Sequence, residues 1–261
     1  MTIDAAILEQ GADSVSQHFV SDRLARSRAR HVKERVIELA LFACALVSVA
    51  TTIGIVLILL LESFQFFRTV SLWRFLTDTQ WTPLFADAHY GNMPLLSGTL
   101  VTSAVALTVA IPLGTIIAIY LSEFAPFAAR EVANPLLEML GGVPTIVYGY
   151  FALLFVTPLL QAIYPELPGF NMLSAGIVMG VMIIPYVSSL SEDAMRAVPM
   201  NLREGSYAMG ATRFHTAIRV VAPAAFSGIA AAYILGVSRA VGETMIVAIA
   251  AGMQPNLTLD P

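Results

Sequence analysis

NLREGSYAMGATRFHTAIRVVAP, residues 201–223, is a polar block between two long apolar runs in the second half of this 261-residue chain. Four arginines lie in the wider segment 191–222: Arg196, Arg203, Arg213 and Arg219. Such a concentration of charge stays outside a lipid bilayer, whereas an uncharged run of about 20 residues is long enough to cross one. The block therefore predicts a membrane protein with a polar loop between its last two spans.

The composition agrees with this interpretation. Hydrophobic residues make up 57% of the chain and charged residues 12%, and the mean hydropathy of +0.76 is far above that of soluble domains. The single cysteine, Cys44, excludes a disulfide framework and a cysteine metal site. The four histidines lack zinc-site spacing, and no GxxxxGK[ST] phosphate loop occurs. We expect no enzymatic activity, no metal, no cofactor in this chain and no nucleic-acid partner.

Uncharged or nearly uncharged runs predict five membrane-spanning helices, at residues 39–61, 95–121, 139–161, 172–190 and 223–251. The first run has no charged residue over 23 positions, which at 1.5 Å per residue crosses a hydrocarbon core of about 30 Å. Pro112 and Pro185 predict bends in the second and fourth spans. The GGVP sequence at 141–144 predicts that the third span is bent or begins with a separate short helix. The expected fold is an all-α, polytopic transmembrane protein.

The positive charges predict the orientation. Eleven of the fourteen lysine and arginine residues fall on one side of this topology, which the positive-inside rule assigns to the cytoplasm. Residues 1–35 are then a cytoplasmic polar tail, which we expect to be disordered at the membrane surface, and residues 36–261 form a transmembrane domain. Because no apolar run begins before Val36, we expect no cleavable signal. The predicted location is the inner (plasma) membrane, multi-pass, with the amino terminus in the cytoplasm.

The polar block has an internal order. The letters EGS at 204–206 are followed by three residues, then Gly210, then nine residues and VVAP at 220–223. This spacing fits two short helices that meet at Gly210, because a residue without Cβ permits a tight corner. The order resembles the cytoplasmic EAA loop of ABC importer permeases. Gly205 and Ser206 stand where that loop usually has alanines, Val220 replaces its isoleucine, and Ala222 replaces its leucine. The alternative is a solvated basic loop that only sets the topology.

A second constellation is the pair Arg239 and Glu243 inside the fifth predicted span. An arginine at the centre of a span costs roughly 2.5–3.5 kcal/mol on insertion scales, so it usually faces a partner or a wet cavity on a transport path. Four residues apart on a helix, the two side chains share a face and can pair. The arginine fork matches a tetrahedral oxyanion such as phosphate or sulfate. The alternative is a self-neutralised structural pair or a link to another subunit.

Four longer stretches carry a wider resemblance: GNMPLLSGTLVTSA (91–104), EMLGGVPTIVYGYFAL (138–153), SEDAMRAVPMNLREGSYAMGATRF (191–214) and SRAVGETMIVAIAAG (238–252). Together they are similar to phosphate-specific ABC importer permeases of the MetI-like fold, over about residues 62–252. The resemblance implies a phosphate path at Arg239 and Glu243. It also implies that the contact with an ATPase subunit is made by four residues of the polar block: Glu204, Ser206, Tyr207 and Gly210.

The resemblance further implies the assembly around this chain. A second homologous permease subunit, two ATPase subunits that bind ATP and Mg, and an extracytoplasmic phosphate-binding protein are expected, in contact with membrane lipid. Such permeases ordinarily have six spans, so the sixth is expected but absent from this sequence. Two alternatives stay open: a permease for another oxyanion, such as sulfate or molybdate, and a non-transporting structural or channel subunit.

Overall fold

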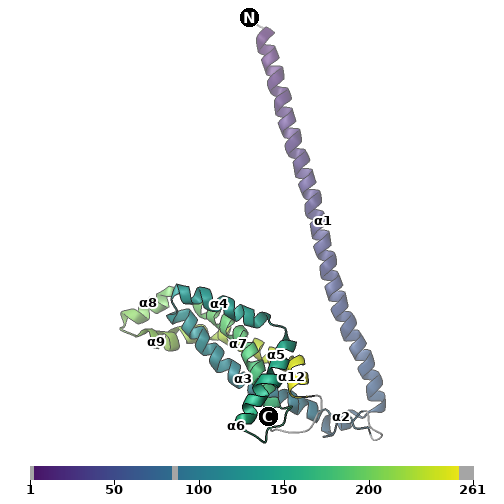
Figure 1. Cartoon of the computed structure of the whole chain (residues 1–261). Helices are drawn as coiled ribbons and strands as arrows, with labels where there is room; N and C mark the ends of the chain where they lie inside the picture. The colour runs from purple at the N-terminus through teal and green to yellow at the C-terminus, as the bar shows by residue number, and fades with distance from the viewer. Residues whose placement is uncertain (1–2, 84–87, 253–261) are drawn as a thin grey trace. The chain divides into compact units, whose positions relative to one another are not determined.

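The computed structural model describes residues 3–83 and 88–252, which leaves residues 84–87 of the predicted outer loop and residues 253–261 outside the described part. The chain divides into two compact units, Met1–Ser71 and Leu72–Pro261. The first unit is one helix, α1 (Ile3–Thr69) (Figure 1). The expectation of a disordered tail is therefore wrong: helix-forming residues and the lack of any proline from 3 to 69 let the tail continue the first span as a helix.

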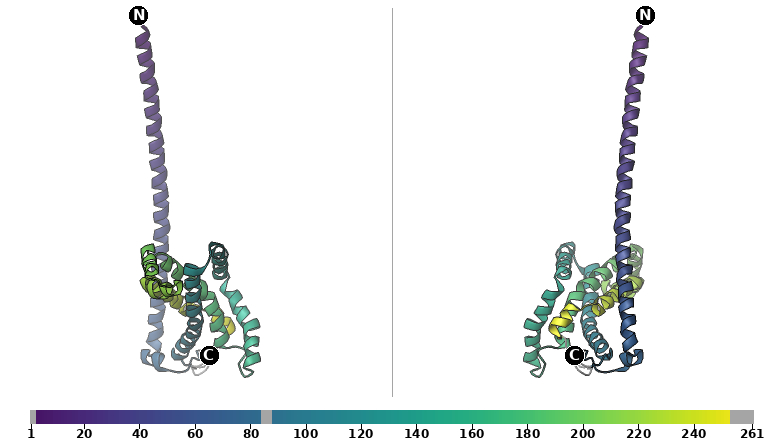
Figure 2. Two further views of the ribbon diagram at one scale, coloured as in Figure 1. Left: turned by 90° about the vertical axis from the view of Figure 1, so that its left-hand side faces the viewer. Right: turned by 90° about the vertical axis from the view of Figure 1, so that its right-hand side faces the viewer.

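The second unit is helical apart from its connections, with one isolated antiparallel bridge between Trp81 and Tyr90 in its described part. Figure 2 shows its helices, coloured from blue-teal to yellow, gathered side by side. The first half contains α2 (Leu72–Thr77), α3 (Met93–Ile119), the π-helical turn η1 (Tyr120–Phe124), α4 (Phe127–Gly142), α5 (Thr145–Phe151), η2 (Ala152–Val156) and α6 (Thr157–Ile163). The second half contains α7 (Met172–Arg196), α8 (Met200–Ala208), α9 (Arg213–Thr216), η3 (Ala217–Val221), α10 (Ala222–Ala224), α11 (Phe226–Val241) and α12 (Met245–Ala250).

Four helical stretches among the described residues are long and apolar enough to cross a membrane: Lys33–Thr69, Met93–Phe124, Thr145–Ile163 and Met172–Arg196. These match the first four predicted spans, although the third begins later. Val143 and Pro144 are extended and separate α4 from α5, because a residue before proline disfavours the helical region. The expected separate helix is thus α4. Pro112 and Pro185 lie inside α3 and α7, which continue past them.

The fifth predicted span, 223–251, is not one continuous helix. Its amino-terminal part is bent by 75° where Arg213–Ala224 meets Phe226–Val241. A second break follows between Val241 and Met245, where α11 ends and α12 begins. The break contains Gly242, a poor helix former, and Glu243, whose carboxylate bonds to the following backbone. The fifth span is therefore a discontinuous helix with a polar interruption.

The core of the second unit is the contact between α3 and α7, which is its most extensive helix pair. Small residues bring the two backbones together: a Cβ on Gly180 would lie 2.8 Å from the carbonyl oxygen of Ala106 and 2.8 Å from Cβ of Val109. Close approach through small residues is the usual way for helices to associate in a bilayer, where burial of apolar surface gives no net driving force. This pair supports α11 and α12, which pack on α7.

The connection before α3 is held by a short polar network. Asp78 Oδ2 lies 2.8 Å from Nδ1 of His89, and the backbone N–H of Gln80 donates to Asp78 Oδ1 at 3.1 Å. The hydrogen bond with His89, followed by that from Gln80, lowers the pKa of the Asp78 carboxyl below its ordinary value. Because the folded pKa is lowered, the network stabilises the connection at neutral pH, and this contribution is lost only as the pH falls through that lowered pKa.

The α3–α7 contact predicts an asymmetric response to small substitutions. Gly180→Ala places a methyl group against the α3 backbone, so we expect a loss of about 1–3 kcal/mol in stability through overpacking. Gly98→Ala on α3 is the control, because its Cβ would have only Met172 Sδ within contact, at 4.0 Å. Thermal unfolding of the two detergent-solubilised variants would measure the difference. Equal melting temperatures would contradict the close packing described here.

Candidate functional site

The polar block folds into a compact arm, residues 200–216, made of α8, a corner and α9. Gly210 adopts a φ of +82°, a left-handed conformation that glycine tolerates without strain. The Thr212 side chain accepts a hydrogen bond from the His215 N–H and caps α9. The hydroxyls of Ser206 and Thr216 lie 2.8 Å apart and join the two helices. The prediction of two short helices meeting at Gly210 is confirmed.

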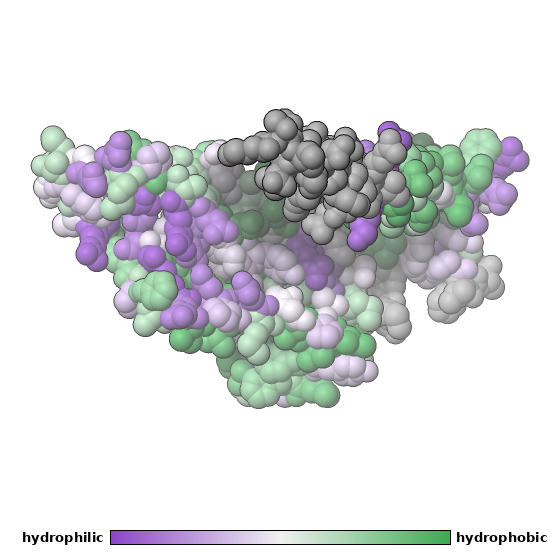
Figure 3. Space-filling view, turned by 90° about the horizontal axis from the view of Figure 1, so that it is seen from above, coloured by the Kyte–Doolittle hydropathy of each residue, from purple (hydrophilic) through white to green (hydrophobic). Residues whose placement is uncertain are grey.

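The four residues predicted to contact an ATPase do not have equal access to a partner. Glu204, Tyr207 and Gly210 are exposed, whereas Ser206 is half-buried and bonded within the arm. An open groove of about 650 Å³ lies between α8 and α9, lined by Leu202, Gly205, Ser206, Met209, Gly210, Ala211, Thr212, His215 and Val220. Figure 3 shows hydrophilic side chains gathered over the end of the molecule that carries α8 and α9, on the left of that view. Their contact with a partner stays a prediction.

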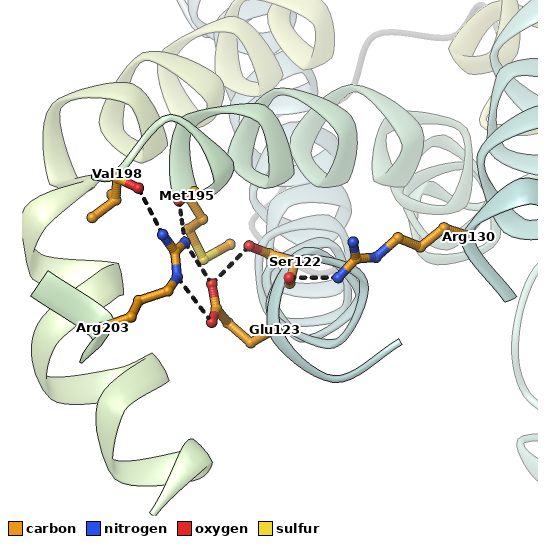
Figure 4. A network of polar contacts seen from close by, with 6 residues as sticks. All are labelled: Ser122, Glu123, Arg130, Met195, Val198 and Arg203. Atoms are coloured by element: carbon orange, nitrogen blue, oxygen red, sulfur yellow. Dashed lines mark hydrogen bonds and ion pairs between the residues drawn. The ribbon is translucent and has the colours of Figure 1, made fainter. Parts of the chain in front are cut away.

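Arg203 anchors the arm to the helices behind it (Figure 4). Its guanidinium is largely buried and donates to Glu123 through two nitrogens, at 2.8 Å to Oε1 and 3.3 Å to Oε2. It also donates to the backbone carbonyls of Met195, at 2.8 Å, and Val198, at 2.6 Å. Met195 lies in the last turn of α7 and Val198 just beyond it, where the helix dipole favours a cation. One side chain thus joins α8 to the ends of α3 and α7.

The same network extends to α4. The Ser122 hydroxyl donates to Glu123 Oε1 at 3.0 Å, and Arg130 donates to the Ser122 carbonyl at 2.7 Å (Figure 4). Sequence reasoning missed this junction, because it treated Arg203 and Arg130 only as topology charges and placed Glu123 in a short connection. No local pattern links residues 80 positions apart. The available signal was Glu123 itself. It is a carboxylate directly after an apolar span, where a negative charge needs a partner.

Arg239 and Glu243 lie where α11 ends. Arg239 Nη2 is 3.6 Å from Glu243 Oε2, with the Glu243 side chain 4% exposed and that of Arg239 41% exposed. The predicted pairing is confirmed, although Glu243 lies just beyond the end of α11 and not on a shared helical face. Glu243 Oε1 also accepts from the N–H groups of Met245, at 3.2 Å, and Ile246, at 3.5 Å, and so caps α12. Arg239 Cζ is 5.8 Å from the centre of the Tyr186 ring, a cation–π distance.

The pair lies near the middle of the span. Arg239 is thirteen positions beyond Phe226, where α11 begins, which corresponds to roughly 20 Å of helix. Beyond the break, α12 is fixed at its far end because the Asn171 N–H donates to the Ala250 carbonyl at 3.1 Å. Non-helical backbone at membrane depth occurs where it is buried in protein or lines a water-filled cavity. A cavity of about 230 Å³ indeed adjoins the break, with Glu243 in its wall.

The arrangement combines a half-exposed guanidinium, a buried carboxylate and a cavity that the carboxylate lines. The half-exposed guanidinium has more donors than its contact with Glu243 uses, so it can bind an anion while the pair persists. The fork of an arginine donates two parallel bonds to an oxyanion. Among the described residues no cluster of side chains suits a metal ion. An arrangement of this kind can bind an anion through the guanidinium.

Comparison with known proteins places the chain among transport proteins. Residues 110–258 match the family model described as "Binding-protein-dependent transport system inner membrane component". The chain is 38% identical over 241 residues to the probable ABC transporter permease YqgH of Bacillus subtilis, covering 92% of this chain and 77% of that protein. It is 33% identical over 218 residues to the phosphate transport system permease PstC of Mesorhizobium japonicum, covering 76% of this chain and 66% of that protein.

A solved structure of the inward-facing MetNI methionine ABC transporter is also similar, with a TM-score of 0.46 at 22% identity, over 61% of this chain and 72% of that chain. The family model covers more than half of the sequence, and the match to YqgH extends over most of both proteins. On this evidence the chain belongs to the binding-protein-dependent transport system inner membrane components, the permease subunits of ABC transporters.

Proposed function

We propose that this permease moves inorganic phosphate into the cell, along a path that passes Arg239 and Glu243. The observation that carries the proposal is the half-exposed Arg239 guanidinium inside a predicted span, paired with Glu243 at 3.6 Å; Glu243 in turn lines a cavity. An exposed guanidinium in such a place suits a tetrahedral oxyanion. Several relatives, among them the PstC proteins of Mesorhizobium japonicum and Haemophilus influenzae, are named as phosphate transport permeases, which favours phosphate over sulfate or molybdate.

The pairing with Glu243 sets the strength of binding. A carboxylate 3.6 Å from Arg239 holds the guanidinium in position while the path is empty, and it repels an arriving anion through its own charge. The anion is then bound transiently, which a conduit needs, since a tightly held substrate would not leave. The apolar side chains exposed beside Arg239 on α11, Ile234 and Leu235, provide a surface for a second, homologous permease subunit that completes the path.

Energy reaches the path through the arm. Two ATPase subunits, which bind ATP and Mg, dock on the exposed face of the arm around Glu204, Tyr207 and Gly210. A movement of the arm is carried by Arg203 to the ends of α3 and α7, because a buried, multiply bonded guanidinium cannot slide without losing its partners. In this assembly the arm and the amino terminus are cytoplasmic, and the extracytoplasmic phosphate-binding protein docks on the loops at 62–94 and 162–171.

The path predicts a strong effect of Arg239→Gln on transport. Two charge-assisted bonds to the anion, each worth about 1.5–3 kcal/mol, are lost, so phosphate uptake should fall by about 100-fold or more. Arg239→Lys should also transport poorly, because a point charge does not reproduce the fork. Uptake of labelled phosphate into cells carrying the complete transporter would measure both, with the exposed Arg35→Gln as control. Failure of Arg239→Gln to assemble would favour the structural-pair alternative, and uptake competed equally by sulfate would favour another oxyanion.

The junction predicts that Arg203→Lys uncouples the transporter. Lysine keeps the charge beside Glu123 but cannot reach both of its oxygens and two carbonyls in fixed directions. In the reconstituted complex we expect ATP hydrolysis to continue while the phosphate moved per ATP falls several-fold. Arg219→Lys, an exposed arginine of the same region, is the matched control. An unchanged ratio in Arg203→Lys would show that the movement reaches the spans by another route.

The stability of the same junction can be measured separately. Arg203→Ala leaves the buried Glu123 carboxylate without a counter-charge, which costs about 3–5 kcal/mol in comparable buried pairs. We therefore expect a clearly lower melting temperature than for Arg219→Ala, measured on the detergent-solubilised permease. A double variant with Glu123→Ala should recover part of the loss, since it removes the uncompensated charge. Additive losses in the double variant would mean that the two side chains do not interact energetically.

A further inference from the structure

The side chain of Tyr186 lies between two interruptions of the helical bundle. Its backbone belongs to α7, where the neighbouring residues Pro185 and Val187 are buried. Its hydroxyl lies 3.5 Å from the carbonyl oxygen of Gly141, in the last turn of α4. Its ring centre lies 5.8 Å from Cζ of Arg239, in the last turn of α11. One aromatic side chain thus reaches both the end of α4 and the end of α11.

The hydroxyl side of this residue is placed at the end of α4. The last carbonyls of a helix have no partner within it, and two tyrosine hydroxyls meet them here. Tyr148 donates to the Leu140 carbonyl at 2.6 Å, and Tyr186 approaches the Gly141 carbonyl at 3.5 Å, the longer and weaker contact of the two. A tyrosine side chain has only two rotatable bonds. The packing of α7 and this contact therefore leave the Tyr186 ring little freedom.

The Arg239 guanidinium needs a constraint beyond its ion pair. The distance of 3.6 Å to Glu243 is longer than a hydrogen bond, so the carboxylate keeps the charge nearby without fixing the direction of the N–H groups. The arginine side chain is 41% exposed, and a long side chain outside a packed core retains much rotamer freedom. The Tyr186 ring supplies the further constraint, because a guanidinium within about 6 Å of a ring centre is attracted to the aromatic face.

An aromatic ring differs from a second carboxylate in what it leaves for an anion. The ring attracts the cation through its quadrupole and has no net charge, so the positive charge of Arg239 is not cancelled. It offers no lone pair and does not compete for the five N–H donors of the guanidinium. A second carboxylate would occupy two of these donors and would repel the anion. A ring is therefore a partner that orients an arginine and leaves it able to bind.

We infer that Tyr186 is a positioning residue for Arg239, and that its ring orients the guanidinium that receives the anion. The inference rests on the proposed function, and it assigns the role to the ring rather than to the hydroxyl. Tyr186 does not itself bind the anion. Because the same side chain lies against the end of α4, the orientation of the guanidinium also depends on where α4 ends.

Substitutions at position 186 test this role in the complete transporter, reconstituted in vesicles. Tyr186→Phe retains the ring and should transport labelled phosphate at nearly the rate of the parent. Tyr186→Leu removes the ring and should lower that rate about three- to tenfold, which corresponds to the loss of one cation–π contact. Tyr150→Leu, on α5, is the matched control: it removes another exposed tyrosine ring and should leave the rate unaltered.

Fluorinated phenylalanines at position 186 separate attraction to the cation from simple packing. Each ring fluorine withdraws electron density from the aromatic face and weakens its attraction for a cation, whereas the volume of the side chain changes little. The logarithm of the transport rate should fall steadily as one, two and three fluorines are introduced, while the melting temperature of the detergent-solubilised complex stays constant. A ring that only packs would give equal rates across the series.

The outcomes separate the positioning role from the proposed function. An equal loss of transport in Tyr186→Phe and Tyr186→Leu would assign the effect to the hydroxyl and overturn the inference. The parent rate in Tyr186→Leu, or equal rates across the fluorinated series, would overturn it as well, whatever the melting temperature of Tyr186→Leu. In these cases the proposed function stands if the parent accumulates phosphate and Arg239→Gln does not. A parent transporter that accumulates no phosphate would end the proposed function, and the inference with it.

Discussion

A bilayer core contains no water to satisfy polar groups, and this constraint organises the whole permease. Each interruption of a helix inside the apolar part comes with its own partner. The break after Val241 is closed by the Glu243 carboxylate, which caps α12. At the end of α7 the Arg203 guanidinium donates to the carbonyl of Met195, in the last turn, and to that of Val198, just beyond the helix. The charged side chains Glu243 and Arg203 thus lie at helix ends, where backbone N–H and C=O groups need partners from outside the helix.

The two polar centres are connected through the same pair of helices. Arg203 holds one end of α3 and α7, and farther along these helices Thr99, Thr102, Ser103 and Met179 form one side of the cavity. Because α3 and α7 pack through glycines at backbone contact, they have little room to move separately. We therefore expect the two helices to move together, so that a displacement at one end reaches the other. In the proposed function, this helix pair would connect the arm to the path.

Much of this organisation follows from the sequence alone. Charge and apolar length predict the spans, the spacing around Gly210 predicts the corner of the arm, and the interval between Arg239 and Glu243 predicts their pairing. The remainder depends on contacts between distant residues. Nothing near Arg203 points to Glu123, and nothing near Tyr186 points to Arg239. The break in the fifth span was not predicted, because a carboxylate in an apolar run shows that a charge must be paired but not that it ends one helix and caps the next.

The bond between Ser206 and Thr216 has a consequence for how a partner recognises the arm. A loop that folds on binding loses conformational entropy at that moment, and part of the binding free energy is spent on ordering it. Here the two helices of the arm are already joined at 2.8 Å, and Gly210 already holds the turn between them. A docking partner therefore meets a preorganised surface. If the proposed ATPase subunits dock here, little of their movement would be absorbed by rearrangement within the arm, and most of it would reach the helices behind the arm.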